Sequence, residues 1–112
     1  MQIKAGETAA GGVAALLNEA GAAPRTRPGA ARRTELDHRL RAELRRLVPL
    51  VEAQAAELNR GTREWYSRDK ALEVACDALT TGLSPSSLAA CLKLTALARA
   101  VRTLDEYADG ES

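Results

Sequence analysis

Hydrophobic residues recur at helical spacing from Thr34 onward. In the first stretch they stand three or four positions apart and so line one face of a helix: Leu36, Leu40, Leu44, Leu47, Val51, Ala55 and Leu58. Thr34 suits the N-cap position, and Asn59-Arg60-Gly61 suits a helix end because glycine readily adopts left-handed backbone angles. The pattern predicts a helix over residues 34–59.

Pro49 lies inside this predicted helix. Proline has no N–H group to bond the carbonyl of Arg45, so we expect a kink near that residue. The apolar positions keep their phase on both sides of Pro49, which favours one bent helix over two shorter ones.

Two more helices are predicted, over residues 62–81 and 85–108. Thr62 is a suitable N-cap for the first, and Ser67 would be a later start. Gly82 suits its end, and Ser84-Pro85 suits an N-cap followed by a first-turn proline. The apolar positions of the two helices are Trp65, Leu72, Ala75, Cys76 and Leu79, then Ala90, Leu94, Leu97, Val101, Leu104 and Ala108.

The first 33 residues differ from the rest of the chain. Glycine and proline interrupt regular structure there, and only Val13–Ala20 could form two turns of helix. Helices that short are marginal in water, so we expect a flexible arm. The predicted fold is all-α: an antiparallel three-helix bundle over residues 34–108, with the arm 1–33 before it and an acidic tail, 109–112, after it.

Composition and charge fit one small helical domain. The 112 residues leave room for a single core, and with 46% hydrophobic but only 3% aromatic residues that core must be aliphatic. A net charge of +1 predicts no general attraction to nucleic acid. No stretch has the character of a membrane span or a secretory signal, so we expect a cytoplasmic protein without membrane contact.

Cys76 and Cys91 are the two cysteines. Both have apolar neighbours in the sequence, as buried reduced thiols usually have, and neither belongs to a C-x-x-C pair. Antiparallel packing of the second and third helices would bring the two residues to similar heights. We expect two buried free thiols rather than a disulfide.

No residue pattern in the chain specifies a reaction. The single histidine, His38, lies off the apolar face of its helix. Carboxylates such as Glu73 and Asp77 stand four apart, as on a solvent-exposed helix face. General acid–base catalysis and metal binding both need convergent groups, which this spacing does not indicate. We expect a protein that is not an enzyme and binds no metal or cofactor.

Several short strings in the first and last predicted helices carry a resemblance. They are Leu40-Arg41, Leu44, Leu47-Val48-Pro49, Val51-Glu52-Ala53 and Ala55, then Leu97-Ala98-Arg99-Ala100-Val101-Arg102, Leu104 and Tyr107. Together they resemble an uncharacterised family of short bacterial helical proteins labelled natural product biosynthesis proteins.

This resemblance covers about residues 36–107 and implies a domain of unknown function in which Pro49 belongs to a recurring pattern. It implies no catalytic residue. Only the label of the family implies a link to natural product biosynthesis.

The leading hypothesis is a helical module that binds another protein or itself. A thin core of alanine and leucine gains stability from association, and tryptophan and arginine are enriched at binding hot spots. The candidate contact residues are Trp65, Tyr66, Arg41, Arg45 and Arg46. The alternative for the aromatic pair is that Trp65 closes the end of the bundle while Tyr66 lies on the surface.

A small DNA-binding regulator is the alternative hypothesis. Residues Ala78–Leu92 have the small-residue, glycine and apolar spacing of a helix-turn-helix. Ser86 and Ser87 would then approach the bases, and Arg32 and Arg33 the phosphates. Against this, the base-facing positions carry no Arg, Asn or Gln, and the same residues equally well mark an ordinary boundary between two helices.

Overall fold

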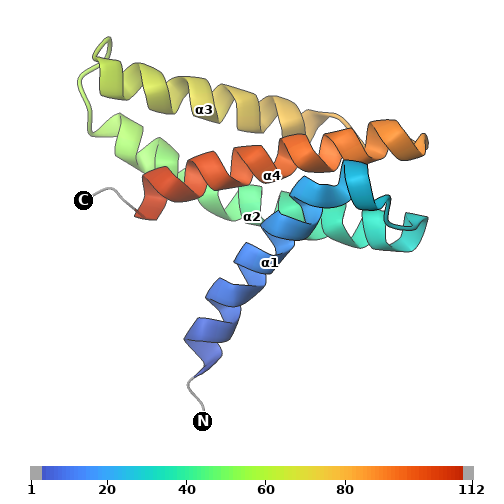
Figure 1. Cartoon of the computed structure of the whole chain (residues 1–112). Coiled ribbons are helices and arrows are strands. Elements are labelled where there is room, and N and C mark those ends of the chain that lie inside the picture. The colour runs from blue at the N-terminus through green and yellow to red at the C-terminus, as the bar shows by residue number, and fades with distance from the viewer. Residues whose placement is uncertain (1–3, 110–112) are drawn as a thin grey trace.

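The computed structural model describes residues 4–109, with side chains from residue 12 onward, and this part of the chain forms four α-helices (Figure 1). They are α1 (Lys4–Thr26), α2 (Ala30–Ala56), α3 (Arg63–Thr80) and α4 (Ser87–Asp109). The all-α class is confirmed. The three-helix bundle is wrong, because α1 adds a fourth helix. Of the predicted arm and tail, residues 1–3 and 110–112 lie outside the described residues.

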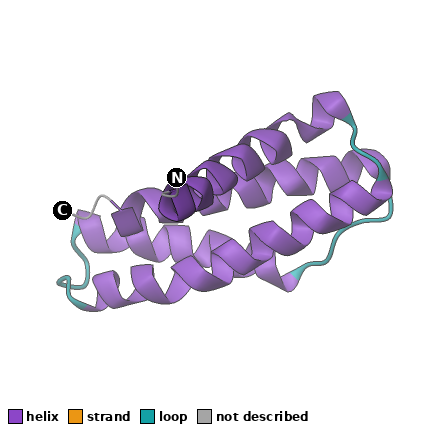
Figure 2. Ribbon diagram, turned by 90° about the horizontal axis from the view of Figure 1, so that it is seen from below, coloured by secondary structure: helices purple, strands orange, loops and turns teal. Residues whose placement is uncertain are grey.

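Helix α4 is central to the arrangement because it contacts all three other helices. Helices α2, α3 and α4 run in alternating directions (Figures 1 and 2), and no α1–α3 contact is found among the residues that the structure describes. The start of α1 stands away from the other helices (Figure 1). The largest fully buried side chains come from α2 and α4: Leu36, Leu40, Leu44, Leu47, Val51, Cys91, Leu94, Leu97, Val101 and Leu104.

Helix α1 replaces the flexible arm expected from the sequence. Its buried residues, Leu16, Leu17, Ala20 and Ala23, share one stripe that packs into the common core. Glycine inside a helix costs about 1 kcal/mol relative to alanine, so tertiary burial has to offset Gly21. The glycine and proline content predicted an interrupted helix, but burial of the apolar stripe stabilises α1 by more than these residues destabilise it.

Pro24 also lies inside α1, and its cost is reduced by a contact from α4. Proline cannot donate to the carbonyl four residues before it, which here belongs to Ala20. The hydroxyl of Thr95 lies 3.2 Å from that carbonyl oxygen and can donate to it. The same hydroxyl lies 3.2 Å from the Cys91 carbonyl of its own helix, so its single proton is shared between that carbonyl and the one that lacks an N–H partner.

The predicted helix boundaries are partly confirmed. Helix α2 begins at Ala30, with Gly29 as its N-cap, so the predicted start at Thr34 is wrong. The helix is continuous through Pro49, as expected. The Thr62 N-cap of α3 is confirmed, since its hydroxyl accepts a hydrogen bond from the Trp65 N–H at 3.2 Å. The alternative start of α3 at Ser67 is therefore wrong.

The predicted start of α4 is wrong by two residues. The helix begins at Ser87, so Ser84 and Pro85 both lie in the connection rather than at the N-cap and first turn. The carbonyl of Ser86 accepts the first helical bond, from the Ala90 N–H at 2.8 Å, and its hydroxyl lies 3.5 Å from the Ala89 N–H. Ser86 thus takes the N-cap position that the sequence assigned to Ser84.

The predicted inner face of α3 needs correction. Ala75 and Ala78 are its buried residues, whereas Cys76 is exposed. Adjacent helical positions are separated by about 100°, so a face centred on Ala75 turns Cys76 outward. Both thiols are free, and only Cys91 is buried.

A two-pronged ion pair joins α1 to α2. Two nitrogens of the Arg32 guanidinium face the two oxygens of one carboxylate: Nε lies 2.6 Å from Glu19 Oε2, and Nη2 lies 2.5 Å from Glu19 Oε1. The Arg32 hydrogen bonds hold the pKa of the Glu19 carboxyl below its usual value of 4.5. The pair therefore favours the docked position of α1 as long as Glu19 is charged.

Replacing Leu16 by alanine tests whether α1 is part of the folded core. Leu16 is 4% exposed, and truncating a leucine in such a setting typically lowers the free energy of unfolding by about 2–4 kcal/mol. The matched control is Leu50→Ala, since Leu50 is 47% exposed, and we expect it to change that free energy by less than about 0.5 kcal/mol. If both variants had equal and small effects on urea unfolding, α1 would not be part of the folded core, and the prediction of a flexible arm would stand.

The Glu19–Arg32 pair predicts a pH dependence of stability. Because the native pKa of Glu19 is lowered, its contribution is fully present above the unfolded value near 4.5 and is lost as the pH falls through the native pKa. Glu19→Gln should therefore be less stable than the wild type at neutral pH, and the difference should shrink on acidification. Urea midpoints of both proteins from neutral pH to about pH 3 measure this. A stability difference between the two proteins that did not change with pH would contradict a stabilising role of the Glu19 charge.

Candidate functional site

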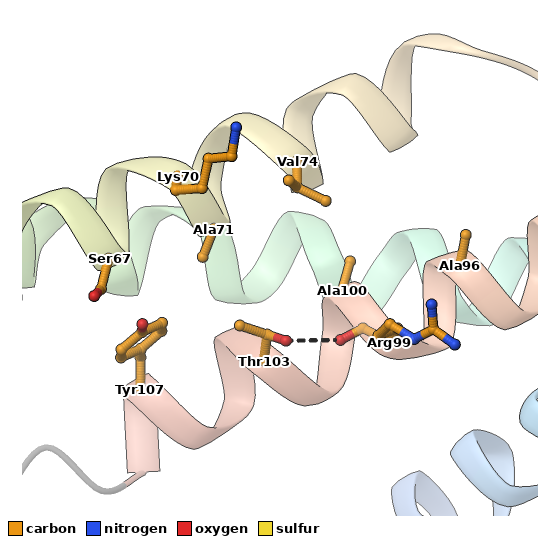
Figure 3. A pocket seen from close by; sticks show the side chains of 9 residues that line it. All are labelled: Ser67, Lys70, Ala71, Val74, Ala96, Arg99, Ala100, Thr103 and Tyr107. Carbon is orange, nitrogen blue, oxygen red and sulfur yellow. Dashed lines mark hydrogen bonds between the residues drawn. The ribbon is translucent and has the colours of Figure 1, made fainter.

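A groove runs between α3 and α4 on the surface of the molecule (Figure 3). Its volume is about 390 Å³ and its lining is mainly apolar. We call it the α3–α4 groove, and its lining residues are Ser67, Lys70, Ala71, Val74, Ala96, Arg99, Ala100, Thr103 and Tyr107.

Small side chains form the apolar part of the groove. Ala71 from α3 and Ala96 and Ala100 from α4 belong to its lining (Figure 3). A methyl group extends far less than a leucine side chain. The two helices can therefore pack closely at these alanines, while the space between them at the surface stays unfilled. Val74 is 49% exposed at its edge. The groove therefore exposes aliphatic surface that no part of the described chain covers.

Exposed hydrophobic residues continue this surface along both helices. On α3, Tyr66 is 60% exposed and stands four residues before Lys70. On α4, Leu88 and Leu92 are 46% and 54% exposed, and they precede Ala96 at four-residue spacing. Residues four apart share a helix face, so Leu88 and Leu92 lie on the face of α4 that carries Ala96, and Tyr66 lies on the face of α3 that carries Lys70.

Two cations and three hydroxyls supply the polar part of the lining. The Thr103 hydroxyl donates to the Arg99 carbonyl at 3.0 Å (Figure 3). The Lys70 ammonium lies 3.8 Å from Glu73, between side chains that are 76% and 72% exposed. Within residues 12–109, Arg99 makes no ion pair. The groove itself contains no carboxylate among its lining residues.

One end of the groove is fixed by contacts that join three helices. The Arg68 guanidinium lies 4.7 Å from the centre of the Tyr107 ring and donates to the Gln54 side-chain oxygen at 3.0 Å. The Gln54 amide in turn donates to the Tyr107 carbonyl at 2.9 Å. These bonds hold the Tyr107 end of α4 against α2 and α3.

The predicted aromatic contacts lie at the start of α3. The Trp65 and Tyr66 rings meet edge to face, with centres 5.2 Å apart. The Arg60 guanidinium lies 5.4 Å from the Trp65 ring. Trp65 is half-buried and Tyr66 is exposed. Tyr66 is therefore open to solvent, whereas Trp65 is partly covered.

Arg41 lies inside the fold and not on a contact surface. Its Nη2 donates to the Thr81 carbonyl at 2.6 Å, and its Nη1 donates to the Leu79 carbonyl at 3.2 Å. Its Nε donates to Asp37 at 2.8 Å. The last carbonyls of a helix lack intrahelical partners and carry partial negative charge, so Arg41 caps the end of α3. The other predicted contacts, Arg45 and Arg46, are exposed on α2, where Arg46 pairs with Glu43.

The residues of the nucleic-acid alternative lie near the starts of α2 and α4, which are at the same end of the molecule (Figure 1). Arg32 is held by Glu19 and Glu35, and Arg33 donates to the Pro28 carbonyl at 2.9 Å. Ser86 and Ser87 lie where α4 begins. A helix-turn-helix needs two helices at roughly 90–120° joined by a short turn. Here α3 and α4 lie side by side in opposite directions (Figure 1).

The remaining chemistry-bearing groups give no second site. Within the described part of the chain, no group of three His, Cys, Asp or Glu residues could hold a metal ion. His38 is exposed on α2. Burial lowers the pKa of the Lys93 ammonium, with the nearby Arg41 charge as a further cause, and Lys93 contacts the Thr81 hydroxyl. Lys93 thus belongs to the same cluster that ends α3.

The described chain is thus a small all-α protein of four helices with an open apolar groove on one face. No described helix is both long and apolar enough to cross a membrane. Residues 7–112 match the family described as a family of unknown function (DUF6415), and the chain belongs to that family. Neither the curated proteins nor the solved structures compared with it gave a match.

Sequence reasoning found Tyr66 but missed the groove itself. Ala71, Ala96 and Arg99 lie off the main apolar stripes and looked like ordinary exposed positions. The available signal was a second stripe, Leu88, Leu92 and Ala96, at four-residue spacing on α4. A helix with two apolar stripes needs more neighbours than a single bundle partner provides.

Replacing Arg41 by methionine tests its capping role. The variant keeps a long side chain but leaves the carbonyls of α3 without their donor and Asp37 without its partner. Losing hydrogen bonds to a largely buried charged group should lower the free energy of unfolding by about 2–3 kcal/mol. The matched control, Arg45→Met on the surface of α2, should change it by less than about 0.5 kcal/mol. Similar urea midpoints for both variants would refute the cap.

Proposed function

We propose that this protein is a non-enzymatic helical interaction module that binds a partner protein in the α3–α4 groove. The observation that carries the proposal is the mainly apolar lining of the α3–α4 groove, with Val74 exposed at its edge and with Tyr66, Leu88 and Leu92 exposed elsewhere on the same two helices. Contiguous exposed apolar surface rimmed by polar groups marks interaction sites in soluble proteins.

The shape of the groove favours a helical segment as its occupant. The lining covers residues 67–74 of α3 and 96–107 of α4, or about 10 and 16 Å of helix at 1.5 Å per residue. That length matches two to three turns of a helix laid alongside. Pockets for small molecules usually enclose most of the ligand surface, whereas a furrow between two helices leaves one side open.

Three further expectations belong to the same proposal. The partner is another protein or a second copy of this chain, and the compartment is the cytoplasm. The link to natural product biosynthesis is carried only by the resemblance described above. A DNA-binding regulator is the competing proposal, and the side-by-side packing of α3 and α4 does not favour it.

Capture from the native cell extract with three versions of the tagged chain tests the proposal. They are the wild type, Val74→Glu in the groove, and Leu50→Glu as a control with nearly the same exposure, 47% against 49%, on another helix. We expect a protein that survives nuclease treatment, binds the wild type and Leu50→Glu, and is lost with Val74→Glu. The purified partner should reproduce this order.

Two results would count against the proposal. Equal retention by all three versions would place binding outside the groove. Material that disappears with nuclease treatment would favour the nucleic-acid alternative. Helical circular dichroism of both variants shows whether either substitution disturbs the fold.

A further inference from the structure

The lining of the α3–α4 groove carries positive charge on both helices. Lys70 projects from α3 and Arg99 from α4, on either side of the alanine floor (Figure 3). None of the nine lining residues is acidic. Any segment that fills the groove must therefore approach two cations while it covers aliphatic surface.

Of the two cations, Arg99 is the more available to pair with a bound segment. It makes no ion pair within residues 12–109, so its charge is available to a partner. It also borders a second hollow, on the α1 side of α4, together with Arg102. Arg102 stands three residues further along and adds a second positive charge on the neighbouring helix face.

Lys70 is also available, although it has an acidic neighbour. Its 3.8 Å contact with Glu73 joins two highly exposed side chains. Exposed pairs of this kind contribute little, because water screens them and both side chains lose freedom in forming them. A carboxylate from a bound segment can therefore replace Glu73 at Lys70.

Resting on the proposed function, we infer that the occupant of the α3–α4 groove is an acidic amphipathic helix of a partner protein. Its small and aliphatic residues would lie on Ala71, Ala96 and Ala100. Its carboxylates, on the two flanks of that apolar stripe, would pair with Lys70 and Arg99. An amphipathic helix presents its apolar stripe at i, i+3, i+4 and i+7 spacing, and charged residues occupy the positions on either side of that stripe.

Charge also excludes the opposite arrangement. A basic helix in the same place would bring like charges against Lys70 and Arg99, which costs binding energy and slows association. A purely apolar helix would remove water from Arg99 without giving it a partner. An acidic amphipathic helix can cover the alanines with its apolar stripe and pair its carboxylates with Lys70 and Arg99.

A pair of synthetic helical peptides tests the inference. Each has about 18 residues, enough for partial helicity in water, with leucine and alanine on one stripe and either glutamate or lysine on the flanks. Backbone amide signals of the full chain are followed by NMR during titration. We expect saturable shifts at Ala71, Val74, Ala96 and Ala100 with the glutamate peptide, and much weaker binding of the lysine peptide.

Charge reversal on the protein provides the matched comparison. Arg99→Glu should weaken binding of the glutamate peptide by about tenfold and improve binding of the lysine peptide, because an attractive pair becomes a repulsive one. Arg45→Glu makes the same change on α2 and should alter neither affinity. An equal effect of both variants would show diffuse charge attraction and overturn the assignment of Arg99.

The outcomes separate this inference from the proposed function. Equal binding of both peptides in the groove would overturn the acidic partner while the interaction module stands. Failure of both peptides to shift the groove signals would overturn both. Shifts of the same signals on dilution of the protein alone would assign the groove to a second copy and overturn the acidic helix.

Discussion

The packing of α4 is the constraint on which the rest of the structure depends. Its buried residues, from Ala90 to Leu104, cover more than one face of the helix, so no single neighbour can bury them. Helices α1, α2 and α3 each take part of that surface. Burial of apolar area is the main favourable term in folding. Packing of α1 on α4 buries apolar surface of both helices, and this explains why α1 is folded.

Polar contacts then fix where the neighbouring helices end and how they lie. Arg41 from α2 binds the last carbonyls of α3, and Thr95 from α4 can donate to the carbonyl that Pro24 leaves without a helical donor. Each contact removes the cost of a buried backbone group that has lost its partner. In both cases a side chain from another helix lies within hydrogen-bond distance of a carbonyl that has no N–H donor in its own helix.

The α3–α4 groove is a consequence of the same packing. Once α4 has turned its bulky residues toward α1 and α2, the side that meets α3 carries the smaller Ala96 and Ala100. Small residues permit close approach of the helices but leave aliphatic surface open to solvent. The candidate site is therefore the shallow place where α3 and α4 meet through small side chains, with Ala100 buried at its base and Val74 exposed at its edge.

The sequence by itself determined the helical class, the buried faces of α2 and α4 and the Thr62 cap, because these depend on local spacing and local hydrogen bonds. It could indicate neither the folding of α1 nor the inner role of Arg41, since both rest on contacts between residues far apart in the chain. The groove was decided by tertiary structure alone. An alanine on a helix becomes the floor of a site only when a second helix lies beside it, and sequence spacing does not contain that distance.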